Sequence, residues 1–197
     1  MSRSSILRGS LILCCLVAAL IYARAGVHTE ELDLPRYGQI GNIGFESQSA
    51  ESLELKRYAG KVLLINFFFT SCQGICPNIM GKMARIHQSY GANSDLQMIS
   101  FTVDPETDQV AQLVSYQKKL KVRTEHNQTW LFARSEQAKL LEFIKSGAKL
   151  VGDKDPNRHS TRVVLVDRQG VVRGYYDGLI PDLFAQLSPA LDQLLGD

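Results

Sequence analysis

Apolar runs of strand length recur along the chain and predict a multistranded sheet. Residues 61–69 (KVLLINFFF) form a continuous apolar run, which is typical of a central strand covered on both faces. Two further strands are expected over residues 96–103 and 129–133. Residues 161–166 and 171–176, separated by a polar turn, predict a hairpin.

Stretches with helical periodicity lie between these strands. Pro77 suits the first turn of a helix that ends at Gly91. Asp108 is expected to cap a helix over residues 109–120, and Ser135 is expected to cap another that ends near Gly147. A terminal helix is expected over residues 181–195. Because helices alternate with apolar strands, the predicted fold class is a three-layer α/β sandwich.

The segment before this pattern has a different character. Residues 26–52 are rich in Gly, Ser and acidic residues with few apolar positions, and they predict a linker followed by a small edge hairpin. Residues 53–197 are then expected to form one domain, because their length suits a single core.

The first 25 residues have the order of an export signal: a basic polar start, an apolar run over residues 11–22, and a small-residue end at Ala25. Twelve apolar residues extend about 18 Å as a helix, less than the ~30 Å hydrocarbon core, so cleavage near Ala25 is one expectation. The other is an uncleaved inner-membrane anchor over residues 6–22. A lipoprotein processed at Cys14 is less favoured, because Leu13 precedes it. Either export route places the domain on the periplasmic side of a bacterial membrane.

Charge and composition narrow the function classes. The chain has 22 Lys and Arg against 20 Asp and Glu, and its net charge of +2 leaves no basic surplus for nucleic acid. Three of the basic residues, Arg3, Arg8 and Arg24, lie in the export segment; the remaining 19 against 20 acids give the rest of the chain a net charge of −1. An apolar content of 45% excludes a disordered chain.

The cysteines carry the candidate chemistry. Cys14 and Cys15 belong to the export segment, which leaves Cys72 and Cys76 in the folded domain. Both follow the first predicted strand at the start of a helix, at the sheet edge where open α/β sheets bind ligands. A helix N-terminus favours the thiolate form of a cysteine. The pair is therefore expected to form a redox disulfide or to bind one metal ion; a structural bridge, or two buried free thiols, is the alternative.

A third metal ligand has to come from elsewhere in the chain. His159 is the preferred histidine, because its Gly-, Asp- and Pro-containing loop directly precedes the strand at residues 161–166. For Met80 and Met83, core packing is favoured over metal binding. The other histidines are expected to be solvated: His28, His87 and His126.

The chain resembles the Sco (SenC) family, named for synthesis of cytochrome c oxidase, in three motifs: FFFTSCQGICP, ISFTVDPETD and RHSTRVVLVDRQGVVRGYYDG. The resemblance covers roughly residues 53–195. It implies a thioredoxin-like fold with extra helix and strand insertions. It also implies copper, as Cu(I) or Cu(II), bound by Cys72, Cys76 and His159. Two thiolates and one imidazole suit that metal, although zinc accepts the same ligands.

The partner implied by the resemblance is cytochrome c oxidase subunit II or a similar copper acceptor. The implied role is a metallochaperone, an assembly factor rather than a turnover enzyme, that delivers copper to the CuA site of that subunit. Thiol–disulfide reduction of the subunit's cysteines is an additional or separate step. Other copper chaperones or thiol reductants are then further partners.

Two positions depart from the family pattern. Gln73 stands where the family usually has Pro, and Arg158 stands where an Asp often precedes the histidine. A positive neighbour stabilises thiolates, which favours the alternative function: a cell-envelope thiol–disulfide oxidoreductase in which Cys72 attacks and Cys76 resolves. A dedicated thioredoxin-like oxidoreductase, however, has Pro directly before the strand that faces its cysteines, and this chain has Ser160 there.

Two acidic residues follow the second predicted strand, on the same edge as the cysteines. Asp104 and Glu106 either form a turn and cap a helix, or take part in partner recognition. The sequence leaves these two roles open.

Overall fold

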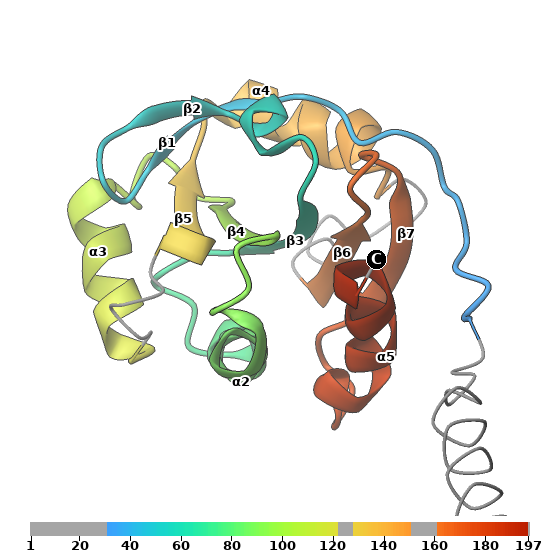
Figure 1. Cartoon of the computed structure of the whole chain (residues 1–197). Helices are drawn as coiled ribbons and strands as arrows, with labels where there is room; N and C mark the ends of the chain where they lie inside the picture. Colours follow the sequence, from blue (N-terminus) through green and yellow to red (C-terminus); the bar gives the residue numbers. More distant parts are fainter. Residues whose placement is uncertain (1–30, 122–127, 151–160, 197) are drawn as a thin grey trace, which may run out of the picture. The chain divides into compact units, whose positions relative to one another are not determined.

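A computed structural model of the chain describes residues 31–121, 128–150 and 161–196. Within them, seven strands form one mixed sheet in the order β2-β1-β5-β4-β3-β6-β7 (Figure 1). In chain order the strands are β1 (Gly44–Ser47), β2 (Ser52–Glu54), β3 (Val62–Phe68), β4 (Leu96–Thr102), β5 (Trp130–Arg134), β6 (Arg162–Val166) and β7 (Val172–Asp177).

Helices cover both faces of this sheet. The described helices are α2 (Ile75–Tyr90), α3 (Val110–Lys119), α4 (Gln137–Glu142) and α5 (Leu183–Gly196), with a 3-10 turn η1 (Leu55–Tyr58) and a π-helical turn η3 (Phe143–Gly147). The apolar residues of α2, α3 and α5 pack on one face, and those of α4 and η3 pack on the other. Figure 1 shows α4 on the side of the sheet opposite α2 and α5. The predicted three-layer α/β sandwich is confirmed.

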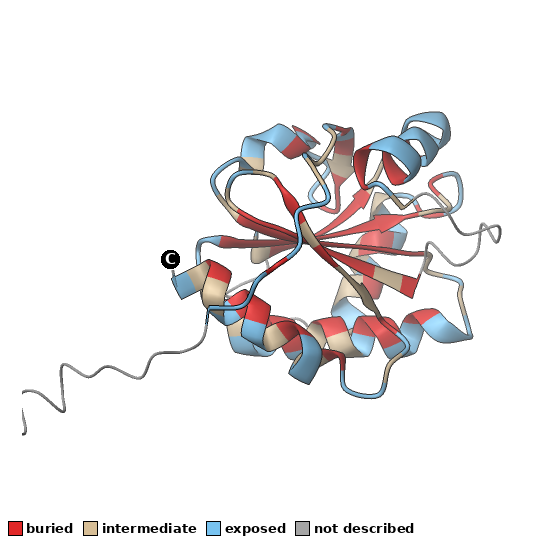
Figure 2. Cartoon of the chain, turned by 90° about the vertical axis from the view of Figure 1, so that its right-hand side faces the viewer, coloured by how far each residue is buried: buried red, intermediate tan, exposed pale blue. Residues whose placement is uncertain are grey.

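Strand β3 is the centre of the sheet, as its continuous apolar run predicts. It pairs in parallel with β4 and antiparallel with β6, and all seven of its residues are buried. Because side chains alternate along a strand, Leu64 and Phe68 enter one core layer while Ile65 and Phe67 enter the other. Figure 2 shows the buried residues along the strands and on the helix faces turned toward them.

The hairpin expected near the start of the domain is formed by β1 and β2, which pair Phe45 with Leu53 at one edge of the sheet. The hairpin ends at Glu54, two residues after the end of the 26–52 segment in which the sequence predicted it. At the other edge, residues 37–40 run beside β7 and exchange backbone hydrogen bonds with Val172 and Gly170. Part of the segment expected to be a linker is therefore attached to the domain.

Both predicted helix caps are wrong. Helix α3 begins after Gln109 and α4 begins after Glu136, and neither residue makes a side-chain cap. The Ser135 hydroxyl donates instead to the carbonyl of Gly44 at 2.6 Å. The Asp108 carboxylate accepts hydrogen bonds from Thr70 and Thr102. Both side chains stabilise contacts between separate segments of the chain. Capping rules consider only neighbouring residues, so they could not predict these contacts.

No helix in residues 31–121, 128–150 and 161–196 has the length and apolar character to span a bilayer. The predicted export segment, residues 1–25, lies outside these ranges, so the expectation of a cleaved signal or an anchor stays a prediction.

Candidate thiol and metal site

Cys72 and Cys76 lie where β3 leads into α2, at the carboxyl ends of the parallel strands. Both are free thiols. Cys76 is the second residue of α2 and is 1% exposed, whereas Cys72 is partly exposed. The two side chains are close enough for each to shift the pKa of the other. The two cysteines, which the sequence predicts to form a disulfide or to bind one metal ion, therefore lie side by side as free thiols.

The two thiols have opposite acidities. Partial burial acts to raise the pKa of Cys72, but hydrogen bonds from the Cys76 thiol and from the N–H groups of Gly74, Ile75 and Cys76 outweigh it, and the pKa is lowered. Burial raises the pKa of Cys76 to about 12, and its hydrogen bond to Cys72 acts in the same direction. Cys72 is thus the thiol that ionises first.

Aromatic side chains pack in the same core cluster as the cysteines. Tyr116 of α3 is 9% exposed, and its ring centroid lies 5.1 Å from that of Phe68 at the end of β3. Burial raises the pKa of Tyr116 to about 12, and the nearby sulfurs of Cys76 and Cys72 and the carboxylate of Asp108 add to this effect. Tyr116 therefore stays neutral. No sequence pattern indicated that this residue lies near the cysteines.

His159, the expected third ligand, lies outside the described residues, as do His28, His126 and Arg158. The described chain resumes at Thr161, whose carbonyl accepts the Gly178 N–H at 2.7 Å. A Cβ on Gly178 would lie only 2.9 Å from Ile79, which is on α2 one turn after Cys76. The strand that follows His159 therefore starts beside the first turns of the cysteine helix.

His87 is not solvated as expected. It is 1% exposed, its Nε2 lies 3.1 Å from the Thr129 hydroxyl, and its ring packs 5.5 Å from that of Trp130. Met80 and Met83 are fully buried in the core, in agreement with the predicted packing role. Among the described residues no group of three or more His, Cys, Asp or Glu side chains is placed to hold a metal ion.

The two acidic residues after β4 form a turn. The Asp104 carbonyl accepts the Asp108 N–H at 2.9 Å, and the Glu106 carbonyl accepts a hydrogen bond from the Gln109 side chain at 2.7 Å. These contacts support the turn-forming role. The Glu106 side chain lines a groove that does not include the cysteines.

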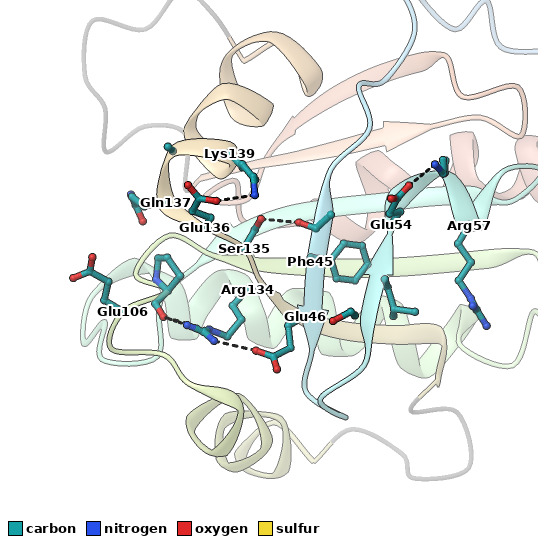
Figure 3. Close-up of a pocket in the computed structure, with 16 residues that line it drawn as sticks. Phe45, Glu46, Glu54, Arg57, Glu106, Arg134, Ser135, Glu136, Gln137 and Lys139 are labelled. Atoms are coloured by element: carbon teal, nitrogen blue, oxygen red, sulfur yellow. Dashed lines mark hydrogen bonds and ion pairs between the residues drawn. The ribbon is translucent and has the colours of Figure 1, made fainter.

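This groove, of about 1120 Å³, lies between the β1–β2 hairpin and the start of α4 (Figure 3). Phe45 and Leu53 contribute apolar surface, and neither cysteine lines it. Its charged side chains are mostly paired with each other: Arg134 with Glu46 at 2.9 Å, Lys139 with Glu136 at 2.7 Å and Lys56 with Glu54 at 2.5 Å. The groove therefore presents little uncompensated charge.

Comparison with known proteins identifies the family. The SCO1/SenC family model matches residues 41–184, which include both cysteines and His159. The chain belongs to the SCO1/SenC family. The SCO1 protein homolog of Bacillus subtilis is 30% identical over 156 residues, 76% of this chain and 79% of that protein.

Solved structures of Sco proteins have the same fold. BsSco, described as a member of the Sco family of cytochrome c oxidase assembly proteins with a disulfide switch, superposes with a TM-score of 0.69 at 24% identity over 85% of this chain and 98% of its own. Copper-bound ScoI of Bradyrhizobium japonicum gives a TM-score of 0.59 at 21% identity over 77% of this chain and 99% of its own. The thioredoxin-like fold of the Sco family is thus the fold of this chain.

Proposed function

We propose that the chain is an exported copper-binding assembly factor that delivers copper to the CuA site of cytochrome c oxidase subunit II. The carrying observation is the pair of adjacent free thiols, Cys72 and Cys76, at the carboxyl end of β3. The family match spans this pair. Copper-bound ScoI and the cytochrome c oxidase assembly protein BsSco support the choice of metal and acceptor.

The donor set fits copper. Thiolates are soft ligands that suit Cu(I), and with the imidazole of His159 they can also hold Cu(II). His159 is two residues before Thr161 in the sequence, and two residues span at most about 7 Å. Since Thr161 is bonded to Gly178 beside Ile79, the chain is long enough to bring an imidazole to this end of α2.

Copper is the cargo of this site, and the two thiols have different parts in its transfer. Binding requires both thiols to lose their protons, and Cys72, with its lowered pKa, loses its proton first. Cys72 is also the more exposed ligand, so an incoming thiolate of the acceptor can replace it first. Buried Cys76 then holds the metal until the exchange is complete.

The cellular setting follows the same proposal. The acceptor is subunit II or a similar copper protein, and other copper chaperones or thiol reductants load the site or keep its cysteines reduced. The domain lies on the periplasmic side of the membrane, either anchored by residues 6–22 or released by cleavage near Ala25. No nucleic acid is involved.

The ligand set is tested by titrating the reduced full chain with Cu(I) in competition with a chromophoric chelator. We expect one equivalent to bind, and we expect His159→Ala to weaken binding by about 100-fold or more, because a three-ligand site loses one donor. His126→Ala is the matched control and should bind as the unmodified chain does.

A Cu(I) affinity unchanged by His159→Ala would exclude the three-ligand site. Loading with Cu(II) gives a second readout, since thiolate-to-Cu(II) charge-transfer absorption requires Cys72 or Cys76 as a ligand. An unmodified chain that shows neither Cu(I) binding nor this absorption would contradict the copper function itself.

A second candidate function is the reduction of disulfides, and the unequal thiols favour it. The Cys72 thiolate attacks a substrate disulfide and forms a mixed disulfide, releasing one substrate thiol. Cys76, once deprotonated, then attacks the Cys72 sulfur, so that the chain is oxidised to a Cys72–Cys76 disulfide and the substrate is fully reduced. The exposure and acidity of each thiol match these roles.

The same variants separate the two functions. Reductase activity requires Cys72 and Cys76 but not His159, whereas copper binding requires all three. If His159→Ala keeps full activity in the cell and either cysteine variant loses it, the oxidoreductase is the better description.

A further inference from the structure

A buried carboxylate connects the cysteine loop to the sheet. Asp108 has 0% exposure and lies just before α3. Its carboxylate accepts hydrogen bonds from the Thr70 N–H at 2.9 Å, from the Thr70 hydroxyl and from the Thr102 hydroxyl. A buried charge is unfavourable unless it is hydrogen-bonded, and these bonds offset that cost. Asp108 thereby joins the end of β4, the start of α3 and the loop that leads to Cys72.

The bond to Thr70 reaches Cys72 through one peptide group. The Thr70 N–H and the Phe69 carbonyl belong to the same planar peptide, so fixing one fixes the direction of the other. The Phe69 carbonyl accepts the Cys72 N–H at 3.3 Å. Asp108 therefore holds one side of this peptide, and Cys72 is held by the other side.

The preceding peptide is held in the same way. Its carbonyl, from Phe68, accepts the Val103 N–H at 2.8 Å. Two successive peptides of the loop that leads to Cys72 are thus fixed to the β4–α3 segment, and Asp108 is the side chain that secures the second of them.

We propose that Asp108 is a positioning residue that holds the cysteine loop in the conformation with two adjacent thiols. It acts through Thr70 and the Phe69 carbonyl rather than on the sulfurs. The inference rests on the proposed function only in its consequence for copper. Two thiols held next to each other close a disulfide more readily than thiols in a loosely held loop, so loss of Asp108 disfavours the disulfide form.

The test measures the dithiol–disulfide equilibrium of the metal-free full chain in glutathione buffers. In this reaction glutathione disulfide is reduced to two thiols while Cys72 and Cys76 are oxidised to a disulfide. We expect Asp108→Asn to decrease the equilibrium constant for disulfide formation about tenfold, which corresponds to about 1.4 kcal/mol and to one charged hydrogen bond.

Asp167→Asn is the matched control. Asp167 is also a buried carboxylate, 2% exposed, and it accepts the N–H groups of Gln169 at 3.0 Å and Val171 at 2.8 Å. It lies between β6 and β7, at the end of the sheet away from the cysteines. We expect it to lower the urea midpoint but to change the thiol equilibrium less than about twofold. Equal shifts in the two variants would overturn the proposal.

Variants of Thr70 keep the test decisive if Asp108→Asn fails to fold. Thr70→Ser retains the hydroxyl and the N–H that donate to Asp108, so its equilibrium should match that of the unmodified chain. Thr70→Val retains only the N–H and should shift the equilibrium in the same direction as Asp108→Asn, by a smaller factor. A Thr70→Val chain that folds and shows no shift would contradict the proposal.

Cu(I) competition separates this inference from the proposed function. If the chain binds Cu(I), Asp108→Asn should weaken binding about tenfold, while Asp167→Asn should not. If the unmodified chain does not bind Cu(I), the copper function fails, and the glutathione equilibrium still decides whether Asp108 positions the thiols.

Discussion

Cys72 and Cys76 are four positions apart in the sequence, yet their surroundings differ in kind. Cys72 precedes α2 and accepts hydrogen bonds from the N–H groups at its start, where the helix dipole favours an anion. Cys76 is inside the helix and faces the core, where burial opposes ionisation. A site built in this way has one reactive sulfur and one protected sulfur.

This asymmetry predicts the order of alkylation. Because the pKa of Cys72 is lowered, its thiolate fraction, and hence its reaction rate with iodoacetamide, should level off at a lower pH than for an ordinary cysteine. Cys76, with a pKa of about 12, should react at least about 100-fold more slowly at pH 8. The measurement is mass spectrometry of the reduced, metal-free full chain after timed quenching.

Variants of Cys76 provide the control for this prediction. Cys76→Ser keeps a hydroxyl donor to the Cys72 sulfur, while Cys76→Ala removes the donor and should move the Cys72 rate profile to higher pH. Equal rates at the two cysteines under native conditions would contradict the assignment.

At the residue scale, sequence reasoning found the residues whose chemistry is rare and missed those defined by distant contacts. Cys72 and Cys76 are predictable because a thiol pair directly after a strand, at the start of a helix, is typical of redox or metal chemistry. The burial of His87 depends on Trp130, and the role of Asp108 depends on Thr70. Neither partner is near in sequence, so local patterns could not indicate them.

At the scale of whole elements, helix α2 is held in place by the turn between β7 and α5. Its Lys82 ammonium donates to the carbonyls of Gly178 at 2.9 Å and Ile180 at 2.5 Å, in the turn between β7 and α5. The same turn contacts α2 at Ile79 and pairs with Thr161 at the start of β6. Gly178 is thus the point where the cysteine helix meets the strand that follows His159.

This close approach predicts a large effect of a single methyl group. A Cβ at Gly178 would lie 2.8 Å from the Thr161 carbonyl oxygen and 2.9 Å from Ile79, so Gly178→Ala should destabilise the fold by about 1–3 kcal/mol. Gly81→Ala is the matched control, because Gly81 lies on the exposed side of α2 with nothing within 4 Å of its Cβ position. It should stabilise the fold by about 0.5–1 kcal/mol.

Urea unfolding of the two variants checks both signs. Destabilisation by Gly81→Ala, or no change with Gly178→Ala, would show that the contact between α2 and the β6 start is looser than described. Gly178→Ala should also weaken Cu(I) binding under the proposed function, since the displaced strand follows His159.

Most elements could be predicted from the sequence because each has a clear apolar period. Strand β4 ends one residue before the predicted end, and α2 starts two residues before Pro77. The π-helical turn at residues 143–147 was not predicted. Gly41 packs against it, with its Cβ position 2.5 Å from the Cα of Gly147, which is a tertiary contact that no local pattern contains.

At the scale of the whole molecule, the thiols and the attached N-terminal segment (residues 34–40) lie at opposite ends of the strands. The thiols lie where β3 ends, whereas the segment at residues 34–40 is attached where β7 begins, next to the start of β3. Arg173 makes this attachment: its guanidinium donates to the carbonyls of Leu34 at 2.9 Å and Pro35 at 2.8 Å and pairs with Asp167 at 3.0 Å. The chain therefore enters the domain at the end away from the thiols.

The sequence could not predict this attachment. Residues 26–52 are polar and Gly-rich, a composition that fits a linker, and the side chain that binds them is more than 130 positions away. The single local hint is Leu34, an apolar residue among acids that is 9% exposed in the core.

Arg173→Ala should release this segment without affecting the thiols. Asp167, 2% exposed, would lose its charged partner, and we expect a destabilisation of about 3 kcal/mol together with faster proteolysis within residues 32–40. Lys139→Ala is the control: its pair with Glu136 is exposed, so the loss should stay below about 1 kcal/mol. Urea unfolding and limited proteolysis measure these effects on the full chain. Because the attachment and the thiols are at opposite ends of β3, Cu(I) affinity should be equal in the two variants, and weaker binding by Arg173→Ala alone would show that the two ends of the sheet are coupled.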